Sequence, residues 1–396
     1  MRHKGLNILI TTPHFPYPLV GGERIKLYNL IRHLSSNNKI YLVSMDRGFE
    51  INEQYIEHIK SLNVDVYSFN INKIQSLIRG SFLSLFRNPL EVEYFSHDGF
   101  SNCVNHIITT QNIDLVINLF VRTAEHVKRL PVKKILLAED CRSYYQQRTS
   151  KVTRNIFEKV RRKIDSIKLA KYESQIVNHF DVTTLVTEND INCMKSLNPN
   201  SKFRLLTQGV DTDYFRPPES HILRDHILFL GKLDVLANQL MVNKIVQDIF
   251  PKIEKNLPNA KLIIAGANPT KEIINCKTKN IDIISNPSDI VRIYQSAVIF
   301  LHPHAGGSGI QNKVLEAMSC ECAVITSPSG SNGIDIINNV NGFVANNDED
   351  FVSLCINLLN NETHRNIVGQ NARKYVVNTK SWDKVFSNLD NIIEEL

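Results

Sequence analysis

The sequence lacks any long apolar run. In its 396 residues, no stretch approaches the roughly 18 consecutive apolar residues of a helix that spans a membrane. The first apolar run, residues 6–10, is too short for a secretion signal and leads into a proline-rich loop. We therefore expect a cytoplasmic protein that makes at most a peripheral contact with the inner face of a membrane.

Paired cysteines and a strong charge excess are also missing. The seven cysteines are an odd number, which argues against a disulfide framework and for a reducing compartment. Cys320 and Cys322 have no second pair or histidine cluster near them, so we expect small helix residues rather than metal ligands. The net charge of +6 is far from that of a basic nucleic-acid-binding tail, so no nucleic acid partner is expected.

The composition that is present is that of an ordinary globular protein. Hydrophobic residues make up 42% of the chain and charged residues 22%. The length exceeds that of one simple core, so two domains are expected. Short apolar runs alternate with helical patterns along the chain, which predicts an α/β fold with parallel sheets. We place the first domain at residues 1–208, the second at 209–379 and a last helix at 380–396.

The segment 302–328 contains the clearest ligand-binding pattern. It follows a continuous apolar run at 297–301, which is typical of a parallel strand covered on both faces. Gly306, Gly307 and Gly309 allow a sharp turn and a close approach of a ligand to the backbone. A helix is expected at 313–318, and its first amides and its dipole favour bound phosphate.

Two side chains of this helix indicate a nucleoside diphosphate. Lys313 lies in the first turn, where a cation is useful if an anion docks there. Glu316 lies one turn further on, within reach of ribose hydroxyls attached to that anion. The alternative is an ordinary strand–loop–helix unit with a Lys–Glu pair at its surface.

Two strand ends in the first half are further candidates. An expected strand at 6–11 is followed by Gly21, Gly22 and a helix, a geometry that presents amides to a ligand, although tight turns also use glycine pairs. A strand at 134–138 ends at Glu139 and Asp140, and residues just past a strand's carboxyl end line the crevice of a doubly wound sheet. Asp140 is thus a candidate site residue, or alternatively the cap of the next helix.

Two segments have an unusual surface chemistry. Residues 148–171 contain nine Lys or Arg against Glu158 and Asp165, a positive stripe if the segment is one helix. The stripe is either a solvated face or a surface attracted to an anionic lipid leaflet, at about 1 kcal/mol per well-placed basic residue. Residues 82–95 are rich in aromatic residues; we expect them in the core, and exposed they would form a docking surface.

The motif Gly-Ile-Gln-Asn-Lys-Val-Leu-Glu-Ala-Met at 309–318, with Pro303 before it and a strand after it, resembles the donor-binding motif of GT-B glycosyltransferases of family four, the glycosyl transferases group 1. The closest resemblance is to bacterial sugar transferases of exopolysaccharide biosynthesis. The family pattern is Glu, seven residues, Glu; here the second is Glu316 and the first position is Ser308. The resemblance implies two Rossmann-like domains that face each other across a cleft, with the C-terminal helix crossing back to the first.

The resemblance also assigns roles to individual residues. It implies Asp140, Lys232 and Lys313 as catalytic residues, with both lysines at the donor diphosphate and Asp140 on the acceptor side. The implied donor-binding residues are Gly21, Gly22, Lys232, Asn286, Gly307, Ser308, Gly309, Ile310, Gln311, Asn312, Lys313 and Glu316. Asp211 and Asp213 match the Asp-x-Asp motif of metal-dependent transferases. We nevertheless expect a turn there, with hydrogen bonds between the carboxylates and nearby backbone N–H groups.

The implied function is transfer of a sugar from a nucleoside-diphosphate sugar to a glycan or lipid-linked acceptor in cell-surface polysaccharide biosynthesis. The resemblance implies retention of configuration and no cofactor or metal. Two alternatives stay open. A sugar-nucleotide epimerase would use the same donor site, and a non-catalytic nucleotide-sugar-binding partner protein is a further option because Ser308 departs from the pattern.

Overall fold

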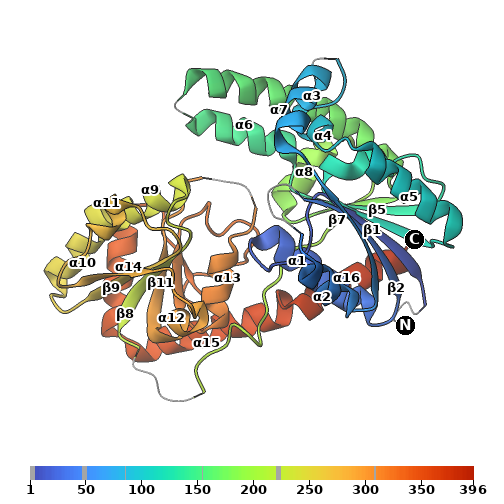
Figure 1. Ribbon diagram of the computed structural model, residues 1–396. Helices are drawn as coiled ribbons and strands as arrows, with labels where there is room; N and C mark the ends of the chain where they lie inside the picture. Colours follow the sequence, from blue (N-terminus) through green and yellow to red (C-terminus); the bar gives the residue numbers. More distant parts are fainter. Residues whose placement is uncertain (1–4, 47–50, 85, 154, 220–223, 307–308) are drawn as a thin grey trace. The chain divides into compact units, whose positions relative to one another are not determined.

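The computed structural model describes residues 5–46, 51–84, 86–153, 155–219, 224–306 and 309–396. Its contacts divide the chain into two compact units, Met1–Thr207 with Val385–Leu396, and Gln208–Lys384 (Figure 1). The boundaries expected from the sequence, after residues 208 and 379, lie one and five residues from these. Each unit is built on one parallel sheet, so the α/β fold with two Rossmann-like domains is confirmed.

The sheet of the first unit has seven parallel strands in the order β3-β2-β1-β4-β5-β6-β7. The strands are β1 (Asn7–Thr12), β2 (Lys39–Asp46), β3 (Val64–Asn70), β4 (Leu115–Leu119), β5 (Lys133–Glu139), β6 (Val182–Leu185) and β7 (Phe203–Leu205). Ile8, Leu9 and Ile10 on β1 are fully buried although they point alternately to opposite faces. This explains the continuous apolar runs, because helices cover both faces of the sheet.

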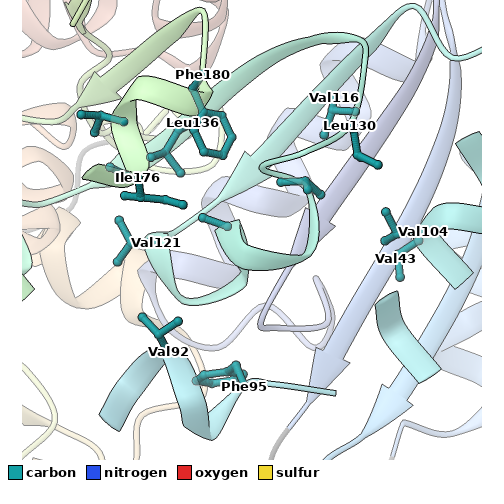
Figure 2. Packing of buried hydrophobic residues seen from close by; sticks show 14 of the residues in the cluster. Val43, Val92, Phe95, Val104, Val116, Val121, Leu130, Leu136, Ile176 and Phe180 are labelled. Carbon is teal, nitrogen blue, oxygen red and sulfur yellow. The ribbon is translucent and has the colours of Figure 1, made fainter. Parts of the chain in front are cut away.

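The helices of the first unit pack on these two faces. They are α1 (Gly22–Ser35), α2 (Glu53–Lys60), α3 (Lys73–Ser84), α4 (Leu90–Tyr94), α5 (Asp98–Thr110), α6 (Arg142–Val152), α7 (Ile156–Ile176), α8 (Glu188–Leu197) and the 3-10 turns η1 (Val121–His126) and η2 (Val177–His179). Figure 2 shows one core, where Val104 of α5, Val121 of η1 and Ile176 of α7 pack near strand residues Val43 and Leu136.

The end of the chain belongs to the first unit. Helix α16 (Trp382–Glu394) begins in the second unit, and its residues from Val385 onward contact the first. Asp390 Oδ1 lies 3.0 Å from His33 Nε2 of α1, and Glu395 Oε2 lies 2.9 Å from Arg204 Nη2. These contacts place the C-terminal part of α16 beside α1.

The sheet of the second unit has six parallel strands in the order β10-β9-β8-β11-β12-β13. The strands are β8 (His226–Leu230), β9 (Lys261–Gly266), β10 (Ile281–Ser285), β11 (Ala297–His302), β12 (Ala323–Thr326) and β13 (Phe343–Val344). The remaining helices are α9 (Leu236–Lys244), the π-helical turn η3 (Ile245–Ile249), α10 (Phe250–Asn256), α11 (Lys271–Ile274), α12 (Ile290–Ser296), α13 (Asn312–Ser319), α14 (Asp348–Asn360) and α15 (Glu362–Thr379).

Both sheets reverse their strand order at one place. In the first unit the order turns between β1 and β4, and in the second between β8 and β11. At such a switch point the loops that leave the two central strands diverge to opposite faces and open a crevice for a ligand. The loops after β1, β4, β8 and β11 are therefore the places where sites are expected.

Two segments differ in part from the interpretations that the sequence suggested. The basic segment 148–171 is not one helix, because α6 ends at Val152 and α7 begins at Ile156. The aromatic segment 82–95 is not uniformly core, since Phe82 and Phe86 are exposed while Tyr94 and Phe95 are buried. In the part of the chain that the structure describes, no helix is long and apolar enough to cross a membrane.

Candidate functional site

The candidate site of the second unit begins where two strand ends meet. Gly231 follows β8 and Gly266 ends β9, and a Cβ atom at position 266 would lie 1.7 Å from the carbonyl oxygen of Gly231. Only glycine allows the two backbones to approach so closely. This contact fixes the loop after β8 at the switch point.

Helix α13 starts at the same switch point, after β11. Gly309 has φ +84°, and Gln311, the N-cap residue, makes no side-chain capping hydrogen bond. Ile310 packs against the core of the unit. The amides of Asn312 and Lys313 lie in the first turn, where an α-helix offers no backbone acceptor, so they can bind an anion.

Lys313 connects the helix with the loop after β8. Its Nζ donates a hydrogen bond to Asn238 Oδ1 at 2.7 Å, and Asn238 Nδ2 donates to the carbonyl oxygen of Lys232 at 2.7 Å. Burial lowers the pKa of Lys313 to about 8, against the opposing attraction of Glu316. The ammonium group is thus held by a neutral amide in a place where its charge is poorly solvated.

Glu316 is oriented by a buried tyrosine. The hydroxyl of Tyr294, a fully buried residue of α12, donates to Glu316 Oε2 at 2.9 Å. Burial raises the pKa of Glu316, while the hydrogen bond from Tyr294 and the charge of Lys313 act in the opposite direction. The tyrosine therefore fixes the rotamer of the carboxylate.

Lys232 and Asn286 lie along the same edge of the sheet. The Lys232 side chain is 60% exposed, and its Nζ lies 3.7 Å from Asp234 Oδ2. Asn268 makes two hydrogen bonds along this edge. Its side-chain Nδ2 donates to Asp234 Oδ2, and its backbone N–H donates to Asn286 Oδ1 at 2.9 Å. Asn286 also has a positive φ of 49° at the end of β10. These loops form a continuous polar rim beside Lys313.

At the switch point of the first unit, the side chains of a glutamate, a histidine and an arginine meet. Glu23 of α1 lies 2.7 Å from His14 Nε2 and 3.9 Å from Nη1 of Arg122. Arg122 is the third residue after the end of β4 at Leu119. Burial opposes ionisation of Glu23, but His14 and Arg122 outweigh it and lower its pKa to about 2. Gly21, with φ +91°, is the N-cap of α1, and Gly22 is its first residue. The expected glycine turn thus leads directly into this cluster.

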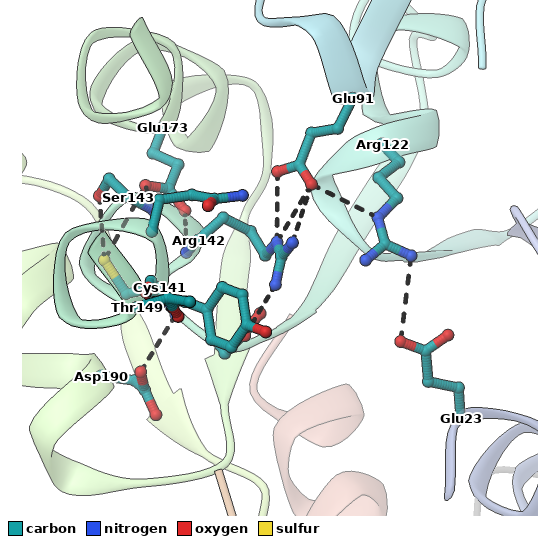
Figure 3. A network of polar contacts seen from close by, with 12 residues as sticks. Glu23, Glu91, Arg122, Cys141, Arg142, Ser143, Thr149, Glu173 and Asp190 are labelled. Carbon is teal, nitrogen blue, oxygen red and sulfur yellow. Dashed lines mark hydrogen bonds and ion pairs between the residues drawn. The ribbon is translucent and has the colours of Figure 1, made fainter. Parts of the chain in front are cut away.

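Arg142 is the centre of a second polar network, shown in Figure 3. Its Nη2 lies 3.0 Å from Glu91 Oε2, and its Nη1 lies 3.2 Å from Asp140 Oδ2. Glu91 also lies 3.8 Å from Arg122 Nε, so the network reaches the switch point. Burial raises the pKa of Asp140, and Arg142 and Arg122 act against this.

A pocket of about 250 Å³ opens beside this network. Glu91, Arg122, Arg142 and Gln146 form its polar wall, and its other lining residues are Leu77, Pro89, Leu90, Tyr94, Phe95, Arg161, Asp165 and Leu169. Guanidinium, carboxylate and amide groups beside aromatic rings are a chemistry that suits a hydroxylated or anionic ligand.

Asp140 does not cap α6, so that alternative was wrong. The N-cap is Cys141, and the carboxylate of Glu173 from α7 accepts hydrogen bonds from the backbone N–H groups of Arg142 and Ser143, at 2.6 and 3.0 Å. Burial raises the pKa of Glu173 to about 7. Asp140 is therefore available for the network with Arg142.

Glu139, next to Asp140, is held in a different pair. It has φ +72°, which is strained for a residue with a side chain, and its Oε1 lies 2.7 Å from Lys26 Nζ of α1. Burial raises the pKa of Glu139, against the charge of Lys26. The buried pair ties the end of β5 to α1.

The Asp-x-Asp segment forms the turn that the sequence predicts. Asp211 Oδ1 accepts hydrogen bonds from the backbone N–H groups of Asp213 and Tyr214, at 3.1 and 2.9 Å. Among the residues that the structure describes, no three His, Cys, Asp or Glu side chains are placed to hold a metal ion. That the reaction needs no metal stays a prediction.

Comparison with known proteins assigns this arrangement to a family. Residues 224–361, most of the second unit, match the model of the glycosyl transferases group 1. An uncharacterised 44.6 kDa protein in the cps region of Klebsiella pneumoniae is 23% identical over 96% of this chain and 98% of its own. The capsular polysaccharide biosynthesis glycosyltransferase CapM of Staphylococcus aureus is 25% identical over 56% of this chain and 61% of its own. The second unit therefore carries a glycosyl transferases group 1 domain, and the chain is a glycosyltransferase.

Solved structures agree with the fold of this glycosyltransferase. HepE of Anabaena, crystallised with UDP, matches with a TM-score of 0.68 at 12% identity over 99% of this chain and 100% of its own. Sucrose-phosphate synthase of Thermosynechococcus elongatus matches with a TM-score of 0.70 at 12% identity over 98% of both chains. The glycosyltransferase therefore has the GT-B fold that the resemblance implied.

The glycosyltransferase brings some of the predicted donor residues together and separates others. Lys313, Glu316 and the α13 amides form one site, beside which Gly309, Ile310, Gln311 and Asn312 build the turn. The Lys232 backbone joins this site through Asn238, whereas its side chain points to Asp234. Gly307 and Ser308 lie outside the described residues. The roles of all these residues stay predictions.

The sequence did not reveal several residues of the glycosyltransferase site. Asn238 and Tyr294 are helix residues without a recognisable motif, and their contacts depend on strand order. Arg122 had a usable signal, since it comes just after a predicted strand at 114–119, as Asp140 does after another. Glu91 and Arg142 gave no local signal, because the pair joins residues 51 positions apart.

Proposed function

We propose that this glycosyltransferase moves a sugar from a nucleoside-diphosphate sugar to a glycan or lipid-linked glycan in cell-surface polysaccharide biosynthesis. The observation that carries the proposal is Lys313. Its ammonium group is partly buried at the N-terminus of α13, and its hydrogen-bond partner is the neutral side-chain amide of Asn238. A diphosphate would supply the counter-charge that this environment lacks.

The relatives support this class of substrate. HepE structures contain UDP, and UDP with glucose, and CapM is named for capsular polysaccharide biosynthesis. A further relative, from Corynebacterium glutamicum, is a GDP-mannose-dependent mannosyltransferase that acts on a phosphatidylinositol mannoside. Both uridine and guanosine nucleotides are therefore candidates for the donor of this chain.

In the proposed reaction, the bond between the anomeric carbon and the diphosphate oxygen breaks, and its electron pair stays on the diphosphate. The oxygen of an acceptor hydroxyl forms the new bond on the same face, which retains the configuration. The hydroxyl proton passes to the departing phosphate. Lys313 and the α13 amides stabilise the negative charge that develops on the diphosphate, and Lys232 adds an exposed positive charge near it.

Glu316 has the role of ribose ligand in this proposal. Tyr294 occupies one oxygen of the carboxylate and fixes its direction. The ribose hydroxyls of the nucleotide donate to the carboxylate, and Asn286 lies in the loop that contacts the base through its backbone. Gly21 and Gly22 border the transferred sugar.

The acceptor is proposed to bind to the first unit. Its polar part enters the pocket whose polar wall includes Glu91, Arg122 and Arg142. Asp140, which is bonded to Arg142, lies on this acceptor side and orients the reacting hydroxyl group. Burial raises the pKa of Asp140, which favours its protonated carboxyl group more than in an exposed aspartate, and the charges of Arg142 and Arg122 act against this.

We further propose a cytoplasmic enzyme that associates peripherally with the inner face of a membrane. All seven cysteines are free thiols, as in a reducing compartment. The basic segment 148–171 supplies attraction to anionic lipids, and of its basic side chains Lys151, Arg161, Lys163 and Lys171 are exposed. Arg162 is not part of this attraction, because it binds Glu158 and Gln146.

Glu316→Gln tests the donor assignment. Hydrogen bonds to a carboxylate contribute about 1.5–3 kcal/mol each, so the affinity for the nucleotide sugar should fall at least roughly tenfold. The fold should persist, because the change removes no packing. The measurement is calorimetric titration with the normal donor and with a 2′,3′-dideoxyribose donor.

With the dideoxy donor the substitution should cost almost nothing, since the hydroxyl partners are already missing. Equal losses with both donors would show that Glu316 does not bind ribose. Turnover is then measured with donor alone and with donor plus acceptor. Release of nucleotide that depends on acceptor supports transfer, whereas conversion of the donor sugar without acceptor would indicate an epimerase instead.

A further inference from the structure

Two helices of the first unit expose large apolar side chains. Ten such side chains are between 51% and 84% exposed: Ile74, Leu77, Ile78, Phe82 and Phe86 on α3 and just after it, and Ile156, Phe157, Val160, Ile164 and Ile167 on α7. On α7 they recur three or four residues apart, so they share one side of the helix. The opposite side of α7 is buried through Leu169, Tyr172 and Ile176.

The two exposed sides form one surface. Lys168 of α7 donates a hydrogen bond to the carbonyl oxygen of Ser84 at the end of α3, at 2.7 Å. Leu77 of α3 and Arg161 of α7 line the same pocket of about 250 Å³. Figure 1 draws both helices at the upper end of the first unit. We call the ten exposed apolar side chains of α3 and α7 the docking face.

Basic side chains surround the docking face. Six of them are exposed: Lys73, Arg79, Arg87, Arg161, Lys163 and Lys171. Helix α3 contains no acidic residue. The acidic residues of α7 are either partly covered, as Glu158 and Asp165 are, or buried, as Glu173 is. Arg79 Nη2 lies 3.8 Å from Oδ1 of the exposed Asp98 of α5, which offsets one of the six charges. The face is therefore apolar at its centre and carries a net positive charge around it.

We propose that the docking face inserts into the surface of an anionic lipid bilayer, with the aromatic rings of Phe82, Phe86 and Phe157 among the acyl chains. Basic side chains beside the apolar ones then meet the lipid phosphates, which is the arrangement of helices that lie in a membrane interface. The inference deepens the proposed membrane contact of the enzyme, because it adds α3 and an apolar contribution to the basic segment.

The charge of the face decides between a membrane and a second copy of this chain. A symmetric dimer through the docking face would place the same six basic side chains opposite one another, and like charges at close range repel. An anionic bilayer offers the opposite charge at the same positions. The pocket beside Leu77 and Arg161 would then open near the lipid headgroups, where a lipid-linked acceptor has its polar part.

The experiment is co-sedimentation of the full chain with vesicles, without donor or acceptor. The vesicles consist of phosphatidylcholine alone or of phosphatidylcholine with phosphatidylglycerol. The wild type should bind the anionic vesicles more tightly. Phe82→Ser/Phe86→Ser/Phe157→Ser should lower that affinity at least about 100-fold, given the transfer free energy of three buried aromatic side chains.

A charge variant separates the apolar from the electrostatic contribution. Arg87→Gln/Arg161→Gln/Lys163→Gln should lose about 100-fold in affinity at low salt, at about 1 kcal/mol per basic residue. At about 1 M salt, where the Debye length is only about 3 Å, the charge variant should bind as the wild type does. The phenylalanine variant should stay impaired at both salt concentrations.

The matched control is Ile274→Ser/Ile337→Ser/Ile367→Ser, three exposed apolar residues of the second unit. This control should bind vesicles as the wild type does, and circular dichroism verifies that every variant is folded. A wild type that fails to bind anionic vesicles, or a phenylalanine variant that binds as tightly as the wild type, would overturn the inference. So would a wild-type dimer that becomes monomeric in the phenylalanine variant. Because no substrate is present, failure here leaves the proposed reaction untouched.

Discussion

Lys313 is the residue on which the donor site depends. The hydrogen-bond partner of Lys313 is the neutral amide of Asn238, not a carboxylate. This partner does not compensate the positive charge of the lysine. Burial then favours the uncharged form, which is why its pKa is lowered to about 8. A bound diphosphate reverses this preference, because it stabilises the ammonium form. In the proposed donor site, nucleotide binding and protonation of Lys313 are therefore coupled.

This coupling predicts how nucleotide affinity depends on pH. Below pH 8 Lys313 is charged before the ligand arrives, so affinity should be constant. Above pH 8 the free enzyme must take up a proton on binding, and affinity should fall by up to about tenfold per pH unit. The phosphates of the ligand do not titrate there, since the last phosphate ionisation is near pH 6. Calorimetric titration from pH 7 to above pH 9 measures the effect.

Lys313→Arg is the control, because a guanidinium group stays charged over the whole range. Its affinity should not change above pH 8. A wild-type affinity that is equally independent of pH, or an arginine variant with the same decline, would show that Lys313 does not meet the diphosphate.

At this scale the sequence predicted Lys313 and Glu316, because both belong to one short motif. Their partners could not be predicted. Asn238 is 75 residues from Lys313 in the chain and Tyr294 is 22 residues from Glu316. These contacts follow from the order of strands in the sheet and from the rotamers of buried side chains, which a local pattern does not encode.

Among the elements, the ends of β8 and β9 show how the backbone builds the site. Position 266 has no room for a side chain, because a Cβ atom there would lie 1.7 Å from the carbonyl oxygen of Gly231. Gly231 in turn lies beside Lys313, whose Nζ would be 3.2 Å from a Cβ atom at position 231. The two glycines therefore set the position of the loop against which Lys313 rests.

Gly266→Ala should destabilise the second unit by at least about 3 kcal/mol, since the new methyl group would displace the backbone at Gly231. Gly306→Ala is the matched control in the same unit. Among the described residues, nothing lies within 4 Å of a Cβ atom at position 306, so that change should stay within about 0.5 kcal/mol. Urea unfolding followed by fluorescence of Trp382, the single tryptophan, reports on this unit. Equal unfolding midpoints for both variants would contradict the close approach of β8 and β9.

The helices of the first unit include features that the sequence did not predict. The positive charge of 148–171 could be predicted from composition, but the break between α6 and α7 could not. A carboxylate from the second helix, Glu173, accepts the first amides of α6 and so fixes the hairpin. The exposure of Phe82 and Phe86 could not be predicted from the sequence either, since an aromatic segment can lie in a core or on a surface.

For the whole molecule, the alternation of strands and helices predicted two parallel-sheet domains, and the structure confirms them. What the alternation does not encode is which side chains meet at a switch point. The cluster of His14, Glu23 and Arg122 joins three separate segments of the first unit. The proposed acceptor side in the first unit thus gathers its polar groups from remote residues, whereas the proposed donor site of the second unit rests largely on one continuous motif.

Above all, we propose that this glycosyltransferase binds a nucleoside-diphosphate sugar at Lys313 and the start of α13. The most direct measurement is thermal unfolding of the second unit, followed by Trp382 fluorescence, with a panel of uridine, guanosine and other nucleotide sugars. A ligand at 100 times its dissociation constant should add about 2.7 kcal/mol of stability. We predict that at least one nucleotide sugar stabilises the wild type and that Lys313→Met, equally folded, loses this stabilisation. A variant that is stabilised as strongly as the wild type, or a panel without any effect on the wild type, would contradict the claim.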